Sequence, residues 1–237
     1  MERSIEEYDF QKGEILLFDK ELDWTSFDLV RKLRNFLTRK SGIKKLKVGH
    51  AGTLDPKATG LMIVCTGKET KNIDLIQAKE KEYVATIRFG ATTPSYDLET
   101  SENEFFPTDH LTEELVNEKL LAFIGEIDQV PPVFSAIKVD GKRAYEYARK
   151  GNDIVLQAKR ITISKLEVLK FEGNDLILKI VCSKGTYIRS LARDLGTALN
   201  SGAYLIGLRR TRIGQLRLED AWDLYEFLNK FDKNATN

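Results

Sequence analysis

The residues of this chain that are best placed to do chemistry lie between positions 48 and 60. The segment reads VGHAGTLDPKATG, and its ionisable side chains are His50, Asp55 and Lys57. Three glycines, a proline and several small residues predict a tightly specified loop between two apolar segments, with Asp55 near the end of a buried strand. Polar loops held by rigid elements often carry catalytic groups. An Asx-type turn near Pro56 fits the spacing at least as well.

Two further segments contain side chains that could take part. The segment SKGTYIR, residues 183–189, reads as a helix N-terminus, which attracts anions through its free N–H groups. Arg189 lies three residues past the expected cap, Thr186, and could bind a carboxylate with both arms of its guanidinium. Tyr83 lies on an otherwise apolar strand face. Each also has an ordinary explanation: a surface arginine on an amphipathic helix, and a core tyrosine with a satisfied hydroxyl.

The elements that would position these residues follow from hydrophobic spacing and turn signals. Strands are predicted over residues 14–19, 61–66, 81–90, 161–171, 176–182 and 203–208. Helices are predicted to begin at caps Thr25, Thr112 and Thr186 and to run to about Leu37, Ile124 and Leu199, with a last helix over 219–229. Residues 128–151 break the pattern and read as an excursion from the core. Strands and helices mix without βαβ regularity, which indicates an α+β fold.

Length and composition narrow the class of protein. The 237 residues are enough for one large domain or two small ones, and 42% hydrophobic with 31% charged residues is typical of a soluble globular protein. No stretch approaches the roughly 20 apolar residues that span a bilayer, and the polar, acidic N-terminus is unlike a targeting signal. Cys65 and Cys182 lie far apart and do not cluster with His50 or His110, so neither a disulfide framework nor a zinc site is predicted. We expect a cytoplasmic location.

Basic residues are concentrated in two blocks, although the net charge is only +1. Eight basic residues and no acidic one lie between Arg31 and Lys47, and seven basic residues are opposed by Asp194 alone between Lys184 and Arg217. Two such blocks on a nearly neutral protein suit a polyanion held on one face. Solvated helix faces explain the charge equally well.

Taken together, these segments resemble one family, the bacterial tRNA pseudouridine(55) synthases of the TruB type. The run GHAGTLDPKATG resembles the family's signature. The other matching segments, in the family's order, are GEILLFDK (13–20) with Trp24-Thr25-Ser26, Lys81-Glu82-Tyr83, PPVFSAIKVDGKRAYEYARKG (131–151), CSKGTYIR (182–189) and IGLRR (206–210). The resemblance covers residues from about 13 to 228.

The resemblance implies both a fold and an activity. The fold is the pseudouridine-synthase fold, a central mixed and mostly antiparallel sheet flanked by helices and loops. One catalytic domain would cover residues 1–237, with an RNA-clamping insertion at about 128–151 and no C-terminal PUA domain. The activity is isomerisation of the uridine at position 55 in the tRNA T-loop, by base flipping, with no cofactor and no metal. The implied partner is the T-arm of tRNA, with no guide RNA and no membrane, and a monomer is the default.

Roles carry over residue by residue to the matching positions. The family's aspartate acts on the target nucleotide as nucleophile or base, here Asp55. Its tyrosine packs against the target base, here Tyr83, and its arginine pairs with the aspartate, here Arg189. Its histidine enters the T-loop and helps to extrude the base, here His50. The resemblance also assigns substrate or RNA contacts to Lys20, Tyr187, Leu208 and Arg209. The stretch 91–100 follows the family only loosely, and we assign no role to Asp97.

Pseudouridine formation breaks the N1–C1′ bond, turns the uracil and rejoins it through C5, with no redox change. Asp55 could attack C1′, add to C6, or abstract a 2′ proton to give a glycal, and the sequence does not choose among these routes. Each route requires an ionised carboxylate in a site that excludes water. A buried aspartate needs a partner to stay ionised, and Arg189 would supply a charge that never titrates.

Three other functions were weighed against this one. A non-catalytic RNA-folding protein on the same scaffold would not need Asp55, Tyr83 and Arg189 together. A guide-RNA-dependent synthase relies on a C-terminal PUA domain, which we do not expect here. An unrelated small-molecule enzyme using the Asp55 loop is disfavoured by the two basic blocks. Conversion of an isolated T-arm without guide or cofactor separates all of them.

Overall fold

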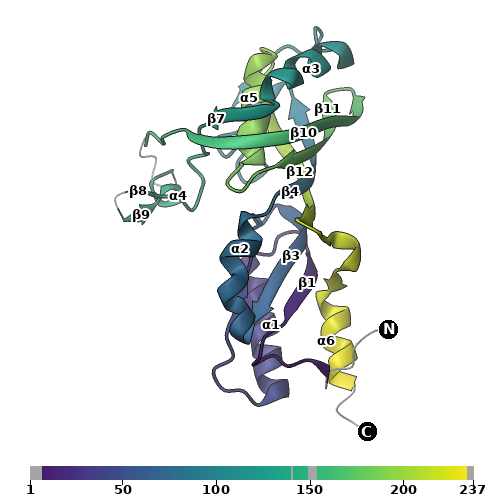
Figure 1. The fold of residues 1–237 in the computed structure, drawn as a ribbon. Coiled ribbons are helices and arrows are strands. Elements are labelled where there is room, and N and C mark those ends of the chain that lie inside the picture. Colours follow the sequence, from purple (N-terminus) through teal and green to yellow (C-terminus); the bar gives the residue numbers. More distant parts are fainter. Residues whose placement is uncertain (1–6, 140, 149–153, 234–237) are drawn as a thin grey trace. The chain divides into compact units, whose positions relative to one another are not determined.

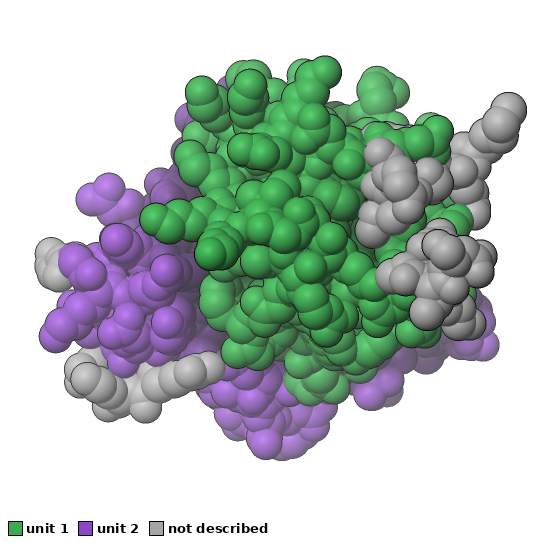
Figure 2. Space-filling view, turned by 90° about the horizontal axis from the view of Figure 1, so that it is seen from below, with its two compact units in different colours: residues 1–82, 209–237 green, residues 83–208 purple. Residues whose placement is uncertain are grey.

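The computed structural model describes residues 7–139, 141–148 and 154–233. The chain folds as two compact units, which Figure 2 shows in different colours. Unit 1 comprises residues 1–82 and 209–237, and unit 2 comprises residues 83–208. Strands β4 (Lys81–Phe89) and β12 (Ala203–Ile213) run from one unit into the other. Each unit is described below in its own frame.

Unit 1 is built around strand β1, with helices beside the sheet (Figure 1). Its further elements are α1 (Ser26–Ser41), β2 (Val48–His50), β3 (Ala58–Thr66), the 3-10 helix η2 (Gly67–Asn72), α2 (Ile73–Ala78), β13 (Leu216–Arg217), η4 (Leu218–Asp220), β14 (Trp222–Asp223) and α6 (Leu224–Lys233). Strand β1 (Ile15–Lys20) pairs antiparallel with β3 and parallel with β14, and β2 pairs antiparallel with β3. The register sets Lys20 opposite Gly60. The last residue of β1 therefore lies beside the loop that precedes β3.

Helix α1 forms where the local signals predicted it. Thr25 is the N-cap and its side chain accepts from the Asp28 main chain, while the Asp28 side chain binds the Thr25 main chain in return. Gly42 ends the helix with a φ of 69°, a conformation that glycine adopts without a Cβ penalty. The helix runs to Ser41, four residues beyond the predicted end, and its apolar face is buried. Phe18 and Phe227 pack nearby, with ring centroids 5.1 Å apart.

Unit 2 contains a sheet in the order β12-β4-β11-β10-β7. Its elements are β5 (Ala91–Thr92), β6 (Glu104–Phe105), α3 (Glu113–Leu120), η3 (Leu121–Phe123), β7 (Gly125–Gln129), β10 (Lys159–Glu172), β11 (Asp175–Cys182) and α5 (Ile188–Ala198). The hairpin predicted around residues 173–175 is confirmed, with Glu172 opposite Asp175. Along β4, Tyr83, Ala85, Ile87 and Phe89 are all buried, as their alternation predicted. The parallel β1–β14 pair stands beside antiparallel pairs such as β1–β3 and β10–β11, so the mixed α+β architecture is confirmed.

Two local predictions were wrong. Thr186 does not cap α5: the helix begins at Ile188 after Tyr187, and the Thr186 hydroxyl donates to the Ser183 carbonyl at 3.1 Å. A threonine can bond its own turn as readily as a helix N–H, and here the turn prevails. The predicted last helix over 219–229 is divided into η4, β14 and α6, so the long helix begins later.

The predicted insertion at residues 128–151 contains a small group of its own. Strands β8 (Lys138–Val139) and β9 (Lys142–Arg143) pair with each other, and α4 (Ala144–Ala148) follows. Figure 1 shows these elements apart from the other strands of unit 2. Residues 140 and 149–151 of the predicted insertion lie outside the described residues, and RNA clamping stays a prediction. In the described part of the chain, no helix combines the length and the apolar character needed to cross a membrane.

Candidate active site

The loop that carries Asp55 connects β2 to β3 in unit 1 and is held at successive main-chain positions. The Ser26 hydroxyl accepts from the Leu54 N–H at 2.9 Å and donates to the Leu54 carbonyl at 3.0 Å. The Pro56 carbonyl accepts from the Asp23 N–H at 2.9 Å, and the Asp55 carbonyl accepts from the Ala58 N–H at 3.0 Å. Asp55 itself is half-buried. These hydrogen bonds hold the main chain on both sides of Asp55, so the loop is tightly specified, as its composition predicted.

Arg210, in the part of β12 that belongs to unit 1, holds the other end of this loop. Its side chain is only 1% exposed. The guanidinium donates to the carbonyls of Gly52 at 3.1 Å, Thr53 at 3.3 Å and Leu61 at 2.8 Å. A buried guanidinium whose N–H groups are satisfied by carbonyls keeps its positive charge in proteins. Arg210 thus ties the loop to β3 and places a permanent charge in the same unit as Asp55.

Close contact between β3 and β12 depends on a glycine. Gly60 has a φ of +103°, and a Cβ at this position would lie 2.3 Å from the Arg210 carbonyl oxygen. Only a residue without a side chain fits there. The glycine that ends the GHAGTLDPKATG run therefore lets the Arg210 main chain approach the start of β3.

Lys20 also belongs to this cluster and is fully buried. Its ammonium donates to the carbonyls of Glu21 at 2.8 Å and Trp24 at 2.7 Å, with the Pro56 carbonyl at 3.5 Å. The pKa of Lys20 is lowered to about 8, mainly because the side chain is buried. The negative charge of Asp55 raises this pKa, and the positive charge of Arg210 lowers it. The structure thus places Lys20 beside the Asp55 loop, and its contact with a substrate stays a prediction.

His50 ends β2 and is half-buried. Burial lowers the pKa of His50, the nearby Arg210 charge lowers it further, and a hydrogen bond with the Gly52 main chain opposes this shift. The imidazole is therefore neutral at neutral pH. A neutral ring can stack on or insert between bases without the cost of desolvating a charge.

In unit 2, Arg189 lies in the first turn of α5 and is 5% exposed. Its Nε atom lies 3.5 Å from the Asp97 carboxylate, which is also buried, and its Nη1 atom donates to the Ser95 carbonyl at 3.3 Å. The Glu99 N–H binds the same carboxylate at 2.9 Å. No role was assigned to Asp97 from the sequence, because the stretch 91–100 follows the family only loosely. Pairing of Arg189 with Asp55 stays a prediction, because the two residues belong to different units.

The remaining predicted residues are distributed between the units. Tyr83 is 8% exposed on β4, Leu208 is partly buried on β12, and Tyr187 exchanges two main-chain hydrogen bonds with the Gln129 side chain, at 2.8 and 3.1 Å. These three belong to unit 2. Arg209 belongs to unit 1, is 45% exposed, and forms an ion pair with Asp19 at 2.6 Å. It is the neighbour, Arg210, that is buried against the Asp55 loop.

Comparison with known proteins decides the family. Residues 38–188 match the sequence model of the TruB family pseudouridylate synthase, N-terminal domain. The chain belongs to the TruB family of pseudouridylate synthases. It is an isomerase, and the RNA-folding and small-molecule alternatives are not favoured.

Relatives in the TruB family match nearly the whole chain. A protein named tRNA pseudouridine synthase B from Phocaeicola vulgatus is 58% identical over 224 residues, which cover 94% of this chain and 95% of the relative. One of the same name from Parabacteroides distasonis is 60% identical over 211 residues, covering 89% and 90%. A crystal structure of a Cbf5-Nop10-Gar1 complex contains a chain that is 27% identical, with a TM-score of 0.72, and covers 96% of this chain and 58% of that one.

For a TruB-family chain, the arrangement in unit 1 has a direct chemical consequence. The half-buried Asp55 carboxylate lies on a loop whose main chain is held by Ser26, Arg210 and Lys20, and a group held in this way needs little reorganisation in any reaction that uses it. The sequence singled out Asp55 and Lys20 as candidates, but it did not single out Arg210. The available signal was the Arg209-Arg210 pair in a predicted strand, because neighbouring strand residues point to opposite faces and one of the two must face inward. The sequence does not say which one.

No group of three or more His, Cys, Asp or Glu side chains that could hold a metal ion occurs among the residues that the structure describes.

Proposed function

We propose that this chain converts the uridine at position 55 of the tRNA T-loop to pseudouridine in the cytoplasm, acting as a monomer without a guide RNA. Two observations support the substrate and the residue. The TruB-family relatives that match nearly the whole chain are named tRNA pseudouridine synthase B. The Asp55 loop is anchored at Gly52, Thr53, Leu54 and Pro56. This anchoring is the observation that carries the assignment of Asp55 as the catalytic carboxylate.

The proposed reaction balances without a redox partner. The N1–C1′ bond breaks, a C5–C1′ bond forms, the hydrogen on C5 leaves as a proton, and N1 gains a proton. Asp55 acts at C1′, at C6 or at the 2′ position, and each of these routes needs its charged form. Arg189 is proposed to hold that charge, and Tyr83 to pack against the uracil. Water must also be kept from the detached sugar, and the burial of Tyr83 favours this.

The target base must first leave its stack, at a cost of a few kcal/mol. His50 is proposed to enter the T-loop, where its neutral imidazole takes the place of the extruded base. Lys20, Tyr187, Leu208 and Arg209 are proposed to contact the RNA or the base. Arg209 is half-exposed and would exchange its Asp19 partner for an RNA phosphate.

The experiment that tests this proposal needs only protein and RNA. A T-arm stem-loop labelled with [5-³H]uridine is incubated with the purified chain, with no cofactor and no guide RNA, and released tritium is counted. Because the C5 hydrogen leaves once per conversion, we expect one equivalent per RNA from position 55. A stem-loop with cytidine at that position should release nothing above background. No release from the first RNA, or equal release from both, contradicts the proposal.

A further inference from the structure

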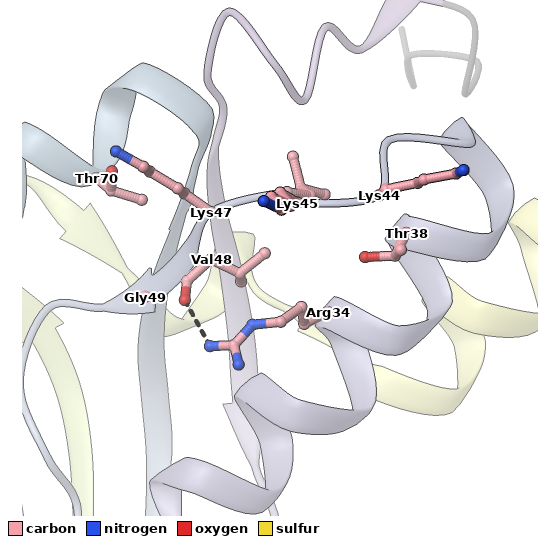
Figure 3. Close-up of a pocket in the computed structure, with 9 residues that line it drawn as sticks. Arg34, Thr38, Lys44, Lys45, Lys47, Val48, Gly49 and Thr70 are labelled. Atoms are coloured by element: carbon pink, nitrogen blue, oxygen red, sulfur yellow. Dashed lines mark hydrogen bonds between the residues drawn. The ribbon is translucent and has the colours of Figure 1, made fainter.

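A second site in unit 1 lies between α1 and the segment that leads into β2. Arg34 and Thr38 face it from α1, Thr70 from η2, and Lys44, Lys45 and Lys47 from the connecting segment, around a cavity of about 460 Å³. Figure 3 shows the Arg34 side chain extending from α1 to the Val48 carbonyl, which accepts its hydrogen bond at 2.9 Å. These six side chains are called the lysine pocket below.

In the part of the chain that the structure describes, no carboxylate neutralises the positive charge of the lysine pocket. No carboxylate lines the cavity. Within residues 7–139, 141–148 and 154–233, none of Lys44, Lys45 and Lys47 forms an ion pair. Other cations on α1 do: Arg31 pairs with Asp28 at 3.1 Å and Lys40 with Asp232 at 2.6 Å. Like charges held close together repel each other unless an anion lies between them.

The geometry of the pocket suits a phosphate group. Arg34 is half-buried, and its hydrogen bond to the Val48 carbonyl fixes the guanidinium while leaving other N–H donors available. The Thr38 hydroxyl makes no side-chain hydrogen bond to the described part of the chain and can donate to an oxygen. The three lysine side chains are exposed, so they reach a ligand without desolvating first. A guanidinium held in place, with lysine ammonium groups around it, is a common arrangement for binding phosphate oxygens.

The lining also indicates which part of an RNA would bind. Single-stranded bases are usually recognised by stacking on aromatic side chains. No aromatic residue lines this cavity, whose apolar lining consists of the aliphatic Leu46 and Val48. The chemistry therefore matches the sugar-phosphate backbone, which carries charge but no sequence information.

The position of the pocket connects it to the proposed active site. Lys47 immediately precedes β2, and His50 is the last residue of that strand. A strand advances about 3.3 Å per residue, so roughly 10 Å separates these two residues. The pocket and His50 are thus close enough to contact the same arm of one RNA.

We propose that the lysine pocket binds backbone phosphates of the substrate RNA and sets the register in which His50 and Asp55 meet their nucleotide. This proposal rests on the proposed function. Its ligand is a phosphodiester, and a free phosphate ion would use the same donors, so the test must distinguish the two.

The test compares two variants with the same loss of charge. The pocket variant carries Lys44→Gln, Lys45→Gln and Lys47→Gln. The control variant carries Lys119→Gln, Lys165→Gln and Lys170→Gln, and each of these lysines already pairs with a glutamate. The dissociation constant of the T-arm stem-loop is measured from 0.05 to 0.3 M salt, together with KM and kcat. All six lysines are on the surface, so both variants should fold, which thermal unfolding checks.

The pocket variant should bind about tenfold to a hundredfold more weakly at 0.1 M salt, with a plot of log affinity against log salt that is less steep by about 2, as expected for two lost phosphate contacts. The loss should appear in KM more than in kcat, and it should be the same for two stem-loops with different stem sequences. The control variant should bind as the wild type does.

Equal affinity of the pocket variant and the wild type overturns the proposal, and so does an equal loss in the control variant. Binding of inorganic phosphate by the wild type that the pocket variant loses, with unchanged RNA affinity, also overturns it. The binding results test only the lysine pocket. The proposed function is tested by tritium release, and it fails if the wild type releases no tritium, even when it binds the RNA.

Discussion

At the scale of single residues, two buried cations govern the surroundings of Asp55. Arg210 is bound to three carbonyls, two of them in the Asp55 loop. Lys20 is bound to the carbonyls of Glu21 and Trp24, between β1 and α1, and lies 3.5 Å from the Pro56 carbonyl of the Asp55 loop. Both side chains therefore hold the main chain around Asp55 in place.

Replacing Arg210 should affect stability and turnover together. Arg210→Met keeps most of the side-chain volume but leaves buried carbonyls without donors, so unfolding free energy should fall by about 2–5 kcal/mol. Because the loop loses its anchor while RNA contacts remain, kcat should fall more than KM rises. Arg210→Lys should recover part of both losses. Denaturant titration and steady-state kinetics check this, and wild-type kcat in a folded Arg210→Met protein contradicts a positioning role.

Lys20 should give the protein a characteristic pH dependence of stability. Its folded-state pKa of about 8 lies below the ordinary value of 10.5, so the unfolded chain binds more protons between these values. Stability from this group therefore increases as pH rises from 8 to 10.5. In Lys20→Met this increase should be absent. The difference in unfolding free energy between the two proteins, followed over that pH range, checks the sign. If unfolding free energy plotted against pH gives parallel curves for the two proteins, folding does not lower the pKa of Lys20.

At the scale of elements, the start of α1 and the Asp55 loop form one structure. Ser26 is the first residue of the helix, and its hydroxyl makes both hydrogen bonds to Leu54. The close approach of β3 to β12 at Gly60 completes the support from the other side. Elements of regular structure, rather than the loop alone, thus determine where Asp55 lies.

Ser26→Ala should therefore damage catalysis as well as folding. It removes a donor and an acceptor from buried Leu54, which should cost about 1–3 kcal/mol of stability and lower kcat. Thr112→Ala is the matched change, because it also removes a hydroxyl at a helix N-terminus but one that binds only its own helix. It should cost about 1 kcal/mol and leave kcat alone. Equal kcat in both variants would show that the loop does not depend on Ser26.

Comparing Gly60→Ala with Gly125→Ala separates the cost of a close contact from the cost of backbone strain. Gly60 and Gly125 have the same φ of +103°, but a Cβ would meet the Arg210 main chain at the first and nothing within 4 Å at the second. Gly125→Ala should cost about 1–2 kcal/mol from strain alone. Gly60→Ala adds overpacking of about 1–3 kcal/mol to that strain. Thermal or denaturant unfolding of the two variants measures their unfolding free energies. The Gly60→Ala protein should be less stable than the Gly125→Ala protein, and equal stability would contradict the close contact.

At the scale of the whole molecule, features that depend on neighbours in the sequence were predicted better than features that depend on distant residues. The α1 cap, the alternation along β4 and the hairpin at residues 173–175 depend on neighbours in sequence, and each was predicted correctly. The inward turn of Arg210 and the Asp97–Arg189 ion pair depend on partners far along the chain, and both were missed. The division into two compact units was also not foreseen, although the length allowed two domains.

The central claim is that Asp55 performs the isomerisation, and the most direct measurement is a single-turnover assay of Asp55→Asn on the T-arm stem-loop. Asparagine keeps the shape but removes the charge, so conversion should slow by at least about a thousandfold. The RNA dissociation constant should stay within about threefold of the wild-type value. Asp232→Asn, the same change at an exposed ion pair, should react normally. Pseudouridine formed by Asp55→Asn at the wild-type rate would contradict the claim.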